Sequence, residues 1–161
     1  MCELLALNAN TPTDMGFSFR GLSRHGGATG EHADGWGLAS FTPEGHGLTL
    51  LREEAPAAFS ALADQLADRS PKALVSIAHI RKATRGVVAL ENCHPFSRSW
   101  AGQTWVFAHN GDLQGTIALG DQYRPFGSTD SEAAFCWILE ELDRANVDPG
   151  DPCALFQQLH H

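Results

Sequence analysis

Two nearly continuous apolar runs constrain the fold of this chain more than any other feature of its sequence. They span residues 73–80 (ALVSIAHI) and 104–108 (TWVFA), are rich in β-branched and aromatic residues, and lack helical spacing. Runs of this kind are typical of buried strands. Arg81 directly follows the first run, and the tripeptide His-Asn-Gly at 109–111 follows the second. The sequence therefore predicts strands that present polar residues at their carboxyl ends, with the intervening loop 82–99 as a place for a site.

Shorter apolar segments predict the other strands. Residues 2–7 read as a first strand, and the stretch 8–14, which contains a proline, ends it. Residues 37–41 and 47–52 read as the two arms of an antiparallel hairpin. The segment 16–35 is rich in glycine, serine and histidine and fits neither the helical nor the strand period, so we expect a long, mobile loop there.

Two segments predict amphipathic helices. Pro56 suits a first helical position, and the residues from Phe59 to Leu66 place apolar side chains at helical spacing. Thr129 can cap a second helix, with Glu132 reaching back in a capping box. Mixed strands and helices of this kind are compatible with an α+β fold but do not by themselves select it.

Composition limits the classes of function. The chain has 161 residues, 43% of them hydrophobic, which suits a single domain with its own core. Its formal net charge of -8 argues against nucleic-acid or anionic-membrane partners, because both need a basic face. No apolar run approaches the ~20 residues of a membrane helix, and the amino terminus lacks the pattern of a signal peptide. We therefore expect a cytoplasmic protein that binds a small polar molecule.

The cysteines and histidines predict neither disulfides nor a metal site. The cysteines at 2, 93, 136 and 153 form no CxxC pair, so in a reducing compartment they are expected to be free thiols, with Cys93, Cys136 and Cys153 as packing residues. The eight histidines and these thiols match no familiar zinc spacing, and no cofactor is expected. We expect structural hydrogen-bonding roles for His32, His79 and His94.

Cys2 is the residue whose chemistry depends most on its position. Removal of Met1 would make it the amino terminus, where its thiol can attack while its own α-amine accepts a proton. The α-amine suits this because its pKa is ~8, against ~10.4 for lysine. By itself the pattern is equally that of a small buried hydrophobe. Likewise, Arg81 could be a solvated charge, Asn-Gly at 110–111 a turn, and Asp130 a partner of a helix dipole.

The ordered set of motifs is more specific than any one of them. The segments MCELLAL, HADGWGLASF, AHIRKATRG, NCHPF, FAHNGDL and GSTDSEAAFCWIL, from Cys2 to about Leu142, resemble the class II glutamine amidotransferases. Within that family they resemble a small stand-alone branch of γ-glutamyl-hydrolase type. The resemblance implies an Ntn-hydrolase αββα sandwich, in which two antiparallel sheets lie between helical layers.

The resemblance also assigns catalytic roles. Cys2 matches the amino-terminal nucleophile, and its α-amine matches the general base. The side-chain amide of Asn110 and the backbone N–H of Gly111 match the oxyanion hole, whose donors are each typically worth ~10²–10³ in rate. The implied reaction passes through a thioester on Cys2 and releases glutamate together with ammonia or an amine.

Three further residues match the substrate-binding positions. Arg81 matches the arginine that holds the substrate α-carboxylate, a task suited to its planar fork, and Thr84 could add its hydroxyl. Asp130 matches the acid that binds the α-ammonium. The substrate is thus expected to be glutamine or a γ-glutamyl compound.

The chain departs from the family pattern in two respects. Lys82 and Arg85 stand where larger members commonly have a tryptophan and a histidine, and the extra positive charge could favour an anionic substrate such as a γ-glutamyl peptide. The family's further strands after the Asp130 helix have no counterpart, although one more helix is predicted to open at Asp151. We therefore expect residues 1–161 to be a single glutamine amidotransferase domain whose sandwich is incomplete at the carboxyl end, either because the domain is truncated or because a partner completes it.

Two partner questions and one alternative function remain open from the sequence. No ammonia-accepting synthase domain is visible, so any acceptor enzyme would be a separate protein, and self-association is equally open. The alternative is a non-catalytic relative that binds an amino acid or serves as a subunit. Retention of Met1 would favour that alternative, because it would acylate the amine of Cys2.

Overall fold

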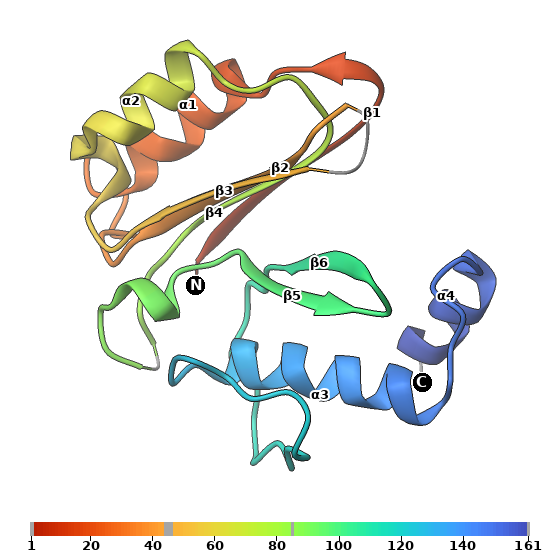
Figure 1. Cartoon of the computed structure of the whole chain (residues 1–161). Coiled ribbons are helices and arrows are strands. Elements are labelled where there is room, and N and C mark those ends of the chain that lie inside the picture. The colour runs from red at the N-terminus through yellow and green to blue at the C-terminus, as the bar shows by residue number, and fades with distance from the viewer. Residues whose placement is uncertain (1, 44–46, 85, 161) are drawn as a thin grey trace.

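The computed structural model describes residues 2–43, 47–84 and 86–160. It contains two antiparallel sheets and four α-helices arranged in layers (Figure 1). The strands are β1 (Glu3–Thr13), β2 (Trp36–Phe41), β3 (Leu48–Glu53), β4 (Ala73–Ile80), β5 (Phe96–Trp100) and β6 (Gln103–Phe107). The α-helices are α1 (Gly16–His25), α2 (Ala61–Asp68), α3 (Asp130–Arg144) and α4 (Pro152–His160), and short 3₁₀ turns span Ala57–Phe59 and Leu90–Asn92.

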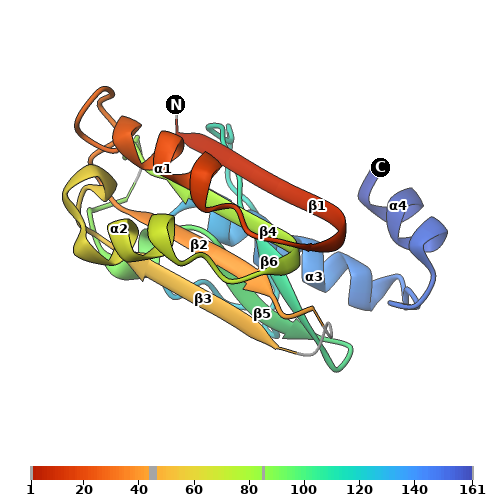
Figure 2. The same ribbon diagram turned by 90° about the horizontal axis from the view of Figure 1, so that it is seen from above.

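The larger sheet has the strand order β1-β4-β2-β3, and every neighbouring pair is antiparallel. Helices α1 and α2 lie side by side over one of its faces, and the β5–β6 hairpin lies on the other side (Figures 1 and 2). Helix α3 lies beyond the hairpin, while α4 lies beside the far end of α3. The expected α+β class with antiparallel sheets is confirmed.

Two apolar clusters hold these layers together. One joins α1 and α2 to the larger sheet and includes Phe19, Trp36 and Ile80, with the Phe19 and Trp36 ring centroids 5.5 Å apart. The other joins the β5–β6 hairpin to α3, where Phe107 stacks on Phe135 at 5.2 Å. Each cluster removes apolar surface from water on one side of a sheet, which is the main stabilising term of folding.

The register of β1 against β4 places the amino terminus at a strand end. Glu3 pairs with Ile80, so Cys2 lies beside the residues that directly follow β4. The predicted strand 73–80 is confirmed, and it supplies the polar segment that begins at Arg81. The first strand runs further than predicted, through residues 8–13, with an irregularity in register between Asn8 and Thr13. A bulge of this kind lets the chain continue as a strand past a proline.

The prediction of a loop over 16–35 is wrong in its first half. Residues 16–25 form α1, because Met15 and Phe19 bury their side chains in the core, and this tertiary packing outweighs the weak local pattern. Residues 27–30 and 32–35 lie outside regular helices and strands, and an isolated bridge joins Gly26 to Glu31.

The helix predicted from Pro56 begins later. Ser60 caps α2 by accepting a hydrogen bond from the N–H of Ala63 at 3.0 Å. Phe59 precedes the helix in a 3₁₀ turn and is 74% exposed, so its place on the apolar stripe was wrongly predicted. Leu66 is buried, as the spacing predicts.

The loop predicted over 82–99 contains a strand, β5, which pairs with β6. A two-residue turn joins them, and both of its residues, Ala101 and Gly102, have positive φ angles of 49° and 74°. This is the backbone conformation that antiparallel hairpins favour. Strand β6 confirms the predicted strand at 104–108, but its residues are exposed or half-buried because they belong to a two-stranded sheet.

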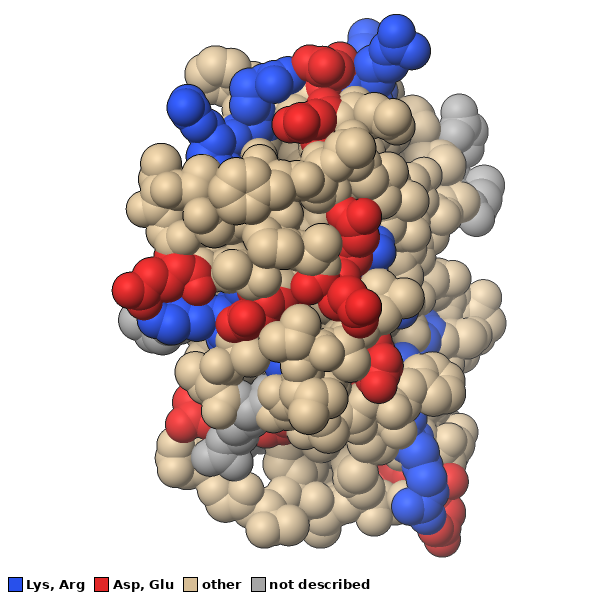
Figure 3. Space-filling view, turned by 90° about the vertical axis from the view of Figure 1, so that its left-hand side faces the viewer, with Lys and Arg blue, Asp and Glu red and all other residues tan. Residues whose placement is uncertain are grey.

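The charges and helix lengths complete the description. Acidic and basic side chains are interspersed on the face shown in Figure 3, where no continuous basic surface is seen. Among the described residues, every helix is too short or too polar to cross a bilayer.

Candidate active site

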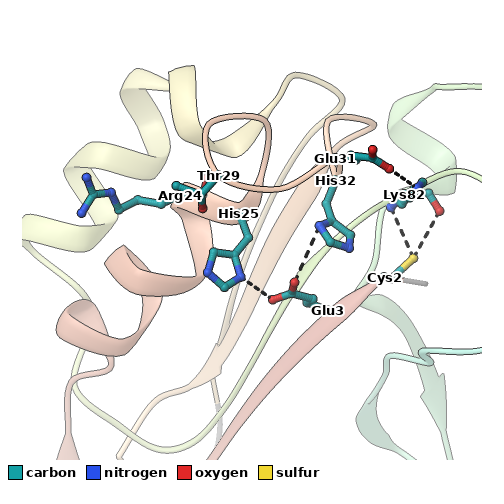
Figure 4. Close-up of polar contacts among 8 residues, drawn as sticks. All are labelled: Cys2, Glu3, Arg24, His25, Thr29, Glu31, His32 and Lys82. Carbon is teal, nitrogen blue, oxygen red and sulfur yellow. Dashed lines mark hydrogen bonds and ion pairs between the residues drawn. The ribbon is translucent and has the colours of Figure 1, made fainter.

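Cys2 is held at the start of β1 by the backbone that follows β4. The N–H of Lys82 donates to Sγ at 3.4 Å, and the thiol lies 3.5 Å from the carbonyl oxygen of Lys82 (Figure 4). Cys2 is partly buried, whereas Cys93 and Cys136 are fully buried and burial raises the pKa of both thiols, that of Cys93 to about 11. The packing roles predicted for these two are confirmed, but Cys153 is exposed. Cys2 is therefore better placed for reaction than either buried thiol.

A small pocket surrounds this thiol. Segments from five parts of the chain line it: Cys2, Arg81, Lys82, Thr84, His94, His109, Gly111, Thr129, Asp130 and Ser131. Its free volume is about 20 Å³, which is room for about one water molecule. The enclosed space next to the thiol is therefore narrow.

Arg81 lies at the end of β4 and is 2% exposed. Its Nη1 donates to the carbonyl oxygens of Asp34 at 3.4 Å and Val87 at 3.1 Å, and its Nη2 donates to that of Gly86 at 3.4 Å. The guanidinium thus ties together segments that flank the pocket, and part of its hydrogen-bonding capacity is used by backbone.

Residues 26–35, which we call the flanking loop, are joined to the same strand ends. The N–H of Arg81 donates to the carbonyl of Gly35 at 2.8 Å, and the Asp34 carboxylate accepts from the N–H of Ala83 at 2.7 Å. Glu31 binds the ammonium of Lys82, and this hydrogen bond raises the pKa of Lys82 and lowers that of Glu31 (Figure 4).

Glu3, the residue after Cys2, contacts both the end of α1 and the flanking loop. Its carboxylate lies 2.8 Å from Nδ1 of His25 and 3.7 Å from Nδ1 of His32 (Figure 4). At 3.7 Å the His32 contact has the length of an ion pair rather than of a hydrogen bond, so the hydrogen-bonding role expected for His32 stays a prediction. The backbone beside Cys2 is thus fixed from both β4 and the flanking loop.

Asp130 and Thr129 lie at the start of α3, on the other side of the pocket. Asp130 accepts hydrogen bonds from the N–H groups of Leu113 and Ser131, both at 2.8 Å. Thr129 caps α3 through the N–H of Glu132 at 3.2 Å, as predicted. The other half of the predicted capping box differs, because the Glu132 carboxylate accepts from the N–H of Gly127 instead.

The segment after β6 brings Gly111 to the pocket but not Asn110. Gly111 lines the pocket, whereas Asn110 is exposed and is absent from the lining. His109 lines it instead, with Nδ1 3.1 Å from the hydroxyl of Ser131. Of the two predicted oxyanion-hole donors, only the one from Gly111 lies at the pocket in this conformation.

Two buried histidines lie between the sheets behind the pocket. The ring centroids of His79, in β4, and His94 are 4.2 Å apart. Burial lowers the pKa of His79 to about 4 and that of His94 to about 2. Both rings are therefore neutral at ordinary pH. The hydrogen-bonding role expected for His94 is not observed, because neither of its ring nitrogens has a hydrogen-bond partner among the described residues. Its position in the pocket lining emerges only from the fold.

The structure brings together most of the predicted site. Five of the six predicted residues, namely Cys2, Arg81, Thr84, Gly111 and Asp130, line one pocket. The prediction about maturation involves Met1, and the prediction about extra positive charge involves Arg85. Both residues lie outside the described residues. Within those residues no cluster of three or more histidine, cysteine or acidic side chains could hold a metal ion.

Comparisons with known proteins point to one family. The family described as "Glutamine amidotransferases class-II" matches residues 1–161. The "Putative glutamine amidotransferase YafJ" of Escherichia coli is 47% identical over 161 residues, which cover 99% of this chain and 62% of that protein. A Haemophilus influenzae protein with the same description is 51% identical over 143 residues, covering 88% of this chain and 48% of that protein.

A solved structure is similar in fold as well. The crystal structure of a "predicted glutamine amidotransferase" from Pseudomonas aeruginosa PA01 matches with a TM-score of 0.70 and 36% identity, over 98% of this chain and 62% of that one. The chain thus spans between about half and three fifths of the length of these relatives.

Proposed function

The chain belongs to the class II glutamine amidotransferase family, and on that premise we propose that it hydrolyses glutamine or a related γ-glutamyl amide through a thioester on Cys2. The observation that carries the proposal is the shared pocket of Cys2, Arg81, Gly111 and Asp130. These residues come from separate segments of the chain, and their convergence on a thiol would be unexpected if each had only a local structural role.

The nucleophile and base would come from one residue. After removal of Met1, the α-amine of Cys2 takes the thiol proton, and the sulfur attacks the amide carbon of the substrate. The tetrahedral intermediate collapses when the C–N bond breaks, and the amine leaves with the proton held by the α-amine. Water then attacks the thioester carbonyl and releases glutamate, returning the proton to Cys2.

The oxyanion would be stabilised by the N–H of Gly111 and the side-chain amide of Asn110. Gly111 already lines the pocket, so we propose that substrate binding turns Asn110 inward. Catalytic hydrogen bonds are often long or absent before substrate binds. The narrow space around Cys2, about 20 Å³, supports a rearrangement of this kind on binding.

Opposite charges would recognise the two ends of the amino acid. Arg81 faces the α-carboxylate with help from the hydroxyl of Thr84, and Asp130 accepts from the α-ammonium. A carboxylate has about four lone-pair sites, so the two backbone N–H groups that Asp130 already binds leave capacity for the ammonium.

The layers support a finer fold proposal. Helices α1 and α2, the four-stranded sheet, the β5–β6 hairpin and α3 follow one another in space (Figure 1). We propose that they form part of an Ntn-hydrolase αββα sandwich, in which the hairpin belongs to the second sheet.

The direct experiment measures glutamate release by protein whose amino terminus has been verified by mass spectrometry. Glutamine, a γ-glutamyl dipeptide and a γ-glutamyl anilide serve as substrates. Processed protein should release glutamate from at least one of them, and protein that retains Met1 should release none. Equal activity of both forms would contradict the role of the α-amine, and binding without turnover by the processed form would favour the non-catalytic alternative.

A further inference from the structure

His94 is a buried polar side chain in the wall of the proposed substrate pocket. It is 4% exposed and lines the pocket together with Cys2 and Arg81. Its ring is fixed between His79 of β4 at 4.2 Å and Phe96 of β5 at 4.4 Å. Contacts with both sheets therefore set the orientation of this ring.

Neither ring nitrogen of His94 has a hydrogen-bond partner among the described residues. Buried polar groups in folded proteins are almost always hydrogen-bonded, and an unsatisfied one lowers stability. Because burial keeps the ring neutral, one nitrogen carries a hydrogen to donate and the other a lone pair to accept. A group that enters the pocket would supply the missing partner.

The surroundings favour an anionic partner. Arg81 lines the same pocket, and Arg52 donates to the carbonyl of Cys93, the residue before His94, at 3.1 Å. Arg81 already donates to three backbone carbonyls. These donations leave fewer of the five guanidinium N–H groups for a carboxylate, and the N–H of His94, on the same wall, can add to the hydroxyl of Thr84 as a further donor.

We propose that His94 donates a ring N–H to the α-carboxylate of the γ-glutamyl substrate, beside Arg81. The inference rests on the proposed function and adds a substrate-contacting residue to it. The ring acts as a neutral donor and transfers no proton. His79 holds it from behind through ring packing and does not line the pocket.

The test compares two ligands and two variants by isothermal titration calorimetry. The ligands are L-glutamate and its α-amide, which lacks the α-carboxylate. His94→Phe keeps a planar ring but removes the donor, and His79→Phe is the matched control in a ring that is equally buried. We expect His94→Phe to weaken L-glutamate binding by about 10- to 100-fold, the range for a hydrogen bond to a charged group. Binding of the α-amide should change about threefold or less, and His79→Phe should leave both affinities near those of the wild type.

The possible outcomes distinguish the role of His94 from the proposed function. Wild-type affinity for L-glutamate in His94→Phe would overturn the role of His94 while leaving the proposed function intact. Equal losses for both ligands would also overturn it, because the effect would then be independent of the carboxylate. A wild-type protein that neither binds L-glutamate nor releases it from any γ-glutamyl amide would overturn both.

A second measurement uses the unaltered protein, in case His94→Phe does not fold. Histidine-ring ¹⁵N NMR should show one neutral ring whose protonated nitrogen shifts when L-glutamate binds. Assignment to His94 uses His94→Gln, which keeps a donor of similar reach and should retain more affinity than the phenylalanine variant. Binding of L-glutamate without any shift of the His94 signal would overturn the inference.

Discussion

The two sides of the candidate pocket are built differently. The nucleophile side, which consists of Cys2, the flanking loop and residues 81–84, is joined by strand pairing and by backbone hydrogen bonds from three segments. The oxyanion side consists of residues 109–115 and the start of α3. Residues 108–129 form no helix or strand, and carboxylates of α3 hold them: Asp130 binds Leu113, and Glu140 binds Gly120 and Gln122.

The difference indicates which side of the pocket we expect to change conformation when substrate binds. On the nucleophile side the thiol is positioned before any ligand arrives. On the oxyanion side Asn110 is exposed, and its move into the pocket would require only residues outside regular structure to shift. Such segments are where low-energy conformational changes are expected. The following predictions test this contrast, in decreasing order of expected effect.

Cys2→Ser should have the largest effect on activity. The hydroxyl is a much weaker nucleophile than the thiolate, and we expect glutamate release to fall by more than ~10³-fold. Cys153→Ser, at an exposed thiol, is the matched control and should behave as wild type. A Cys2→Ser protein that keeps full activity would show that the reactive group lies elsewhere.

Asn110→Ala should lower kcat for glutamate release by ~10²–10³-fold if the side chain enters the oxyanion hole. Because Asn110 is exposed, the free energy of unfolding should stay within about 0.5 kcal/mol of wild type. Gln114→Ala removes another exposed amide of the same segment and serves as the control. Wild-type kcat in Asn110→Ala would mean that the oxyanion side does not rearrange as proposed.

Arg81→Met should affect stability as well as substrate binding. It leaves the carbonyls of Asp34, Gly86 and Val87 without their side-chain donor, so we expect the free energy of unfolding to fall by about 1–3 kcal/mol in urea titrations. Arg20→Met, which removes an exposed arginine paired with Asp68, should cost less than about 1 kcal/mol. Equal losses of unfolding free energy in the two variants would contradict the proposal that Arg81 stabilises the fold.

The buried histidines behind the nucleophile side predict a pH dependence of stability. Their pKa values are about 4 for His79 and about 2 for His94 in the folded protein, below the value of about 6.5 expected when unfolded. The unfolded chain therefore binds more protons below pH 6.5, and the free energy of unfolding should decrease as pH falls from about 6.5 towards 4. Each histidine contributes at most ~1.4 kcal/mol per pH unit.

In His79→Phe, the free energy of unfolding should decrease less steeply as pH falls from about 6.5 towards 4. Unfolding followed by circular dichroism measures this slope. His25→Phe, at an exposed histidine paired with Glu3, is the control and should not make it shallower. An unchanged slope in His79→Phe would show that this ring is not neutral in the folded state.

Lys82→Gln should have the smallest effect. The ammonium is exposed and paired with Glu31, so turnover of glutamine should change less than about twofold, while preference for a γ-glutamyl peptide with an anionic leaving group should drop by about two- to fivefold. Lys72→Gln alters the only other lysine of the chain and should leave that preference unchanged. An unchanged preference in Lys82→Gln would remove the charge argument for an anionic substrate.

Local patterns in the sequence identified much of this molecule correctly. The run 73–80 is a strand followed by Arg81, and Thr129 caps α3, because both depend on residues that are neighbours in the chain. Patterns failed where packing decided the outcome. Residues 16–25 form α1 because the side chain of Phe19 is buried against Trp36. Residues 96–100 form β5 because they pair with β6.

The sequence by itself determined the family, the nucleophile candidate and the identity of the charged residues around it, because these are carried by short motifs in a fixed order. Only the tertiary structure decided how they meet. The pairing of Glu3 with Ile80 brings Cys2 against Lys82, and Asn110 lies outside the pocket. His94 lies in the pocket wall, where its ring nitrogens have no hydrogen-bond partner in the described part of the chain. Register and side-chain direction depend on contacts between segments far apart in the chain, and no local pattern specifies them.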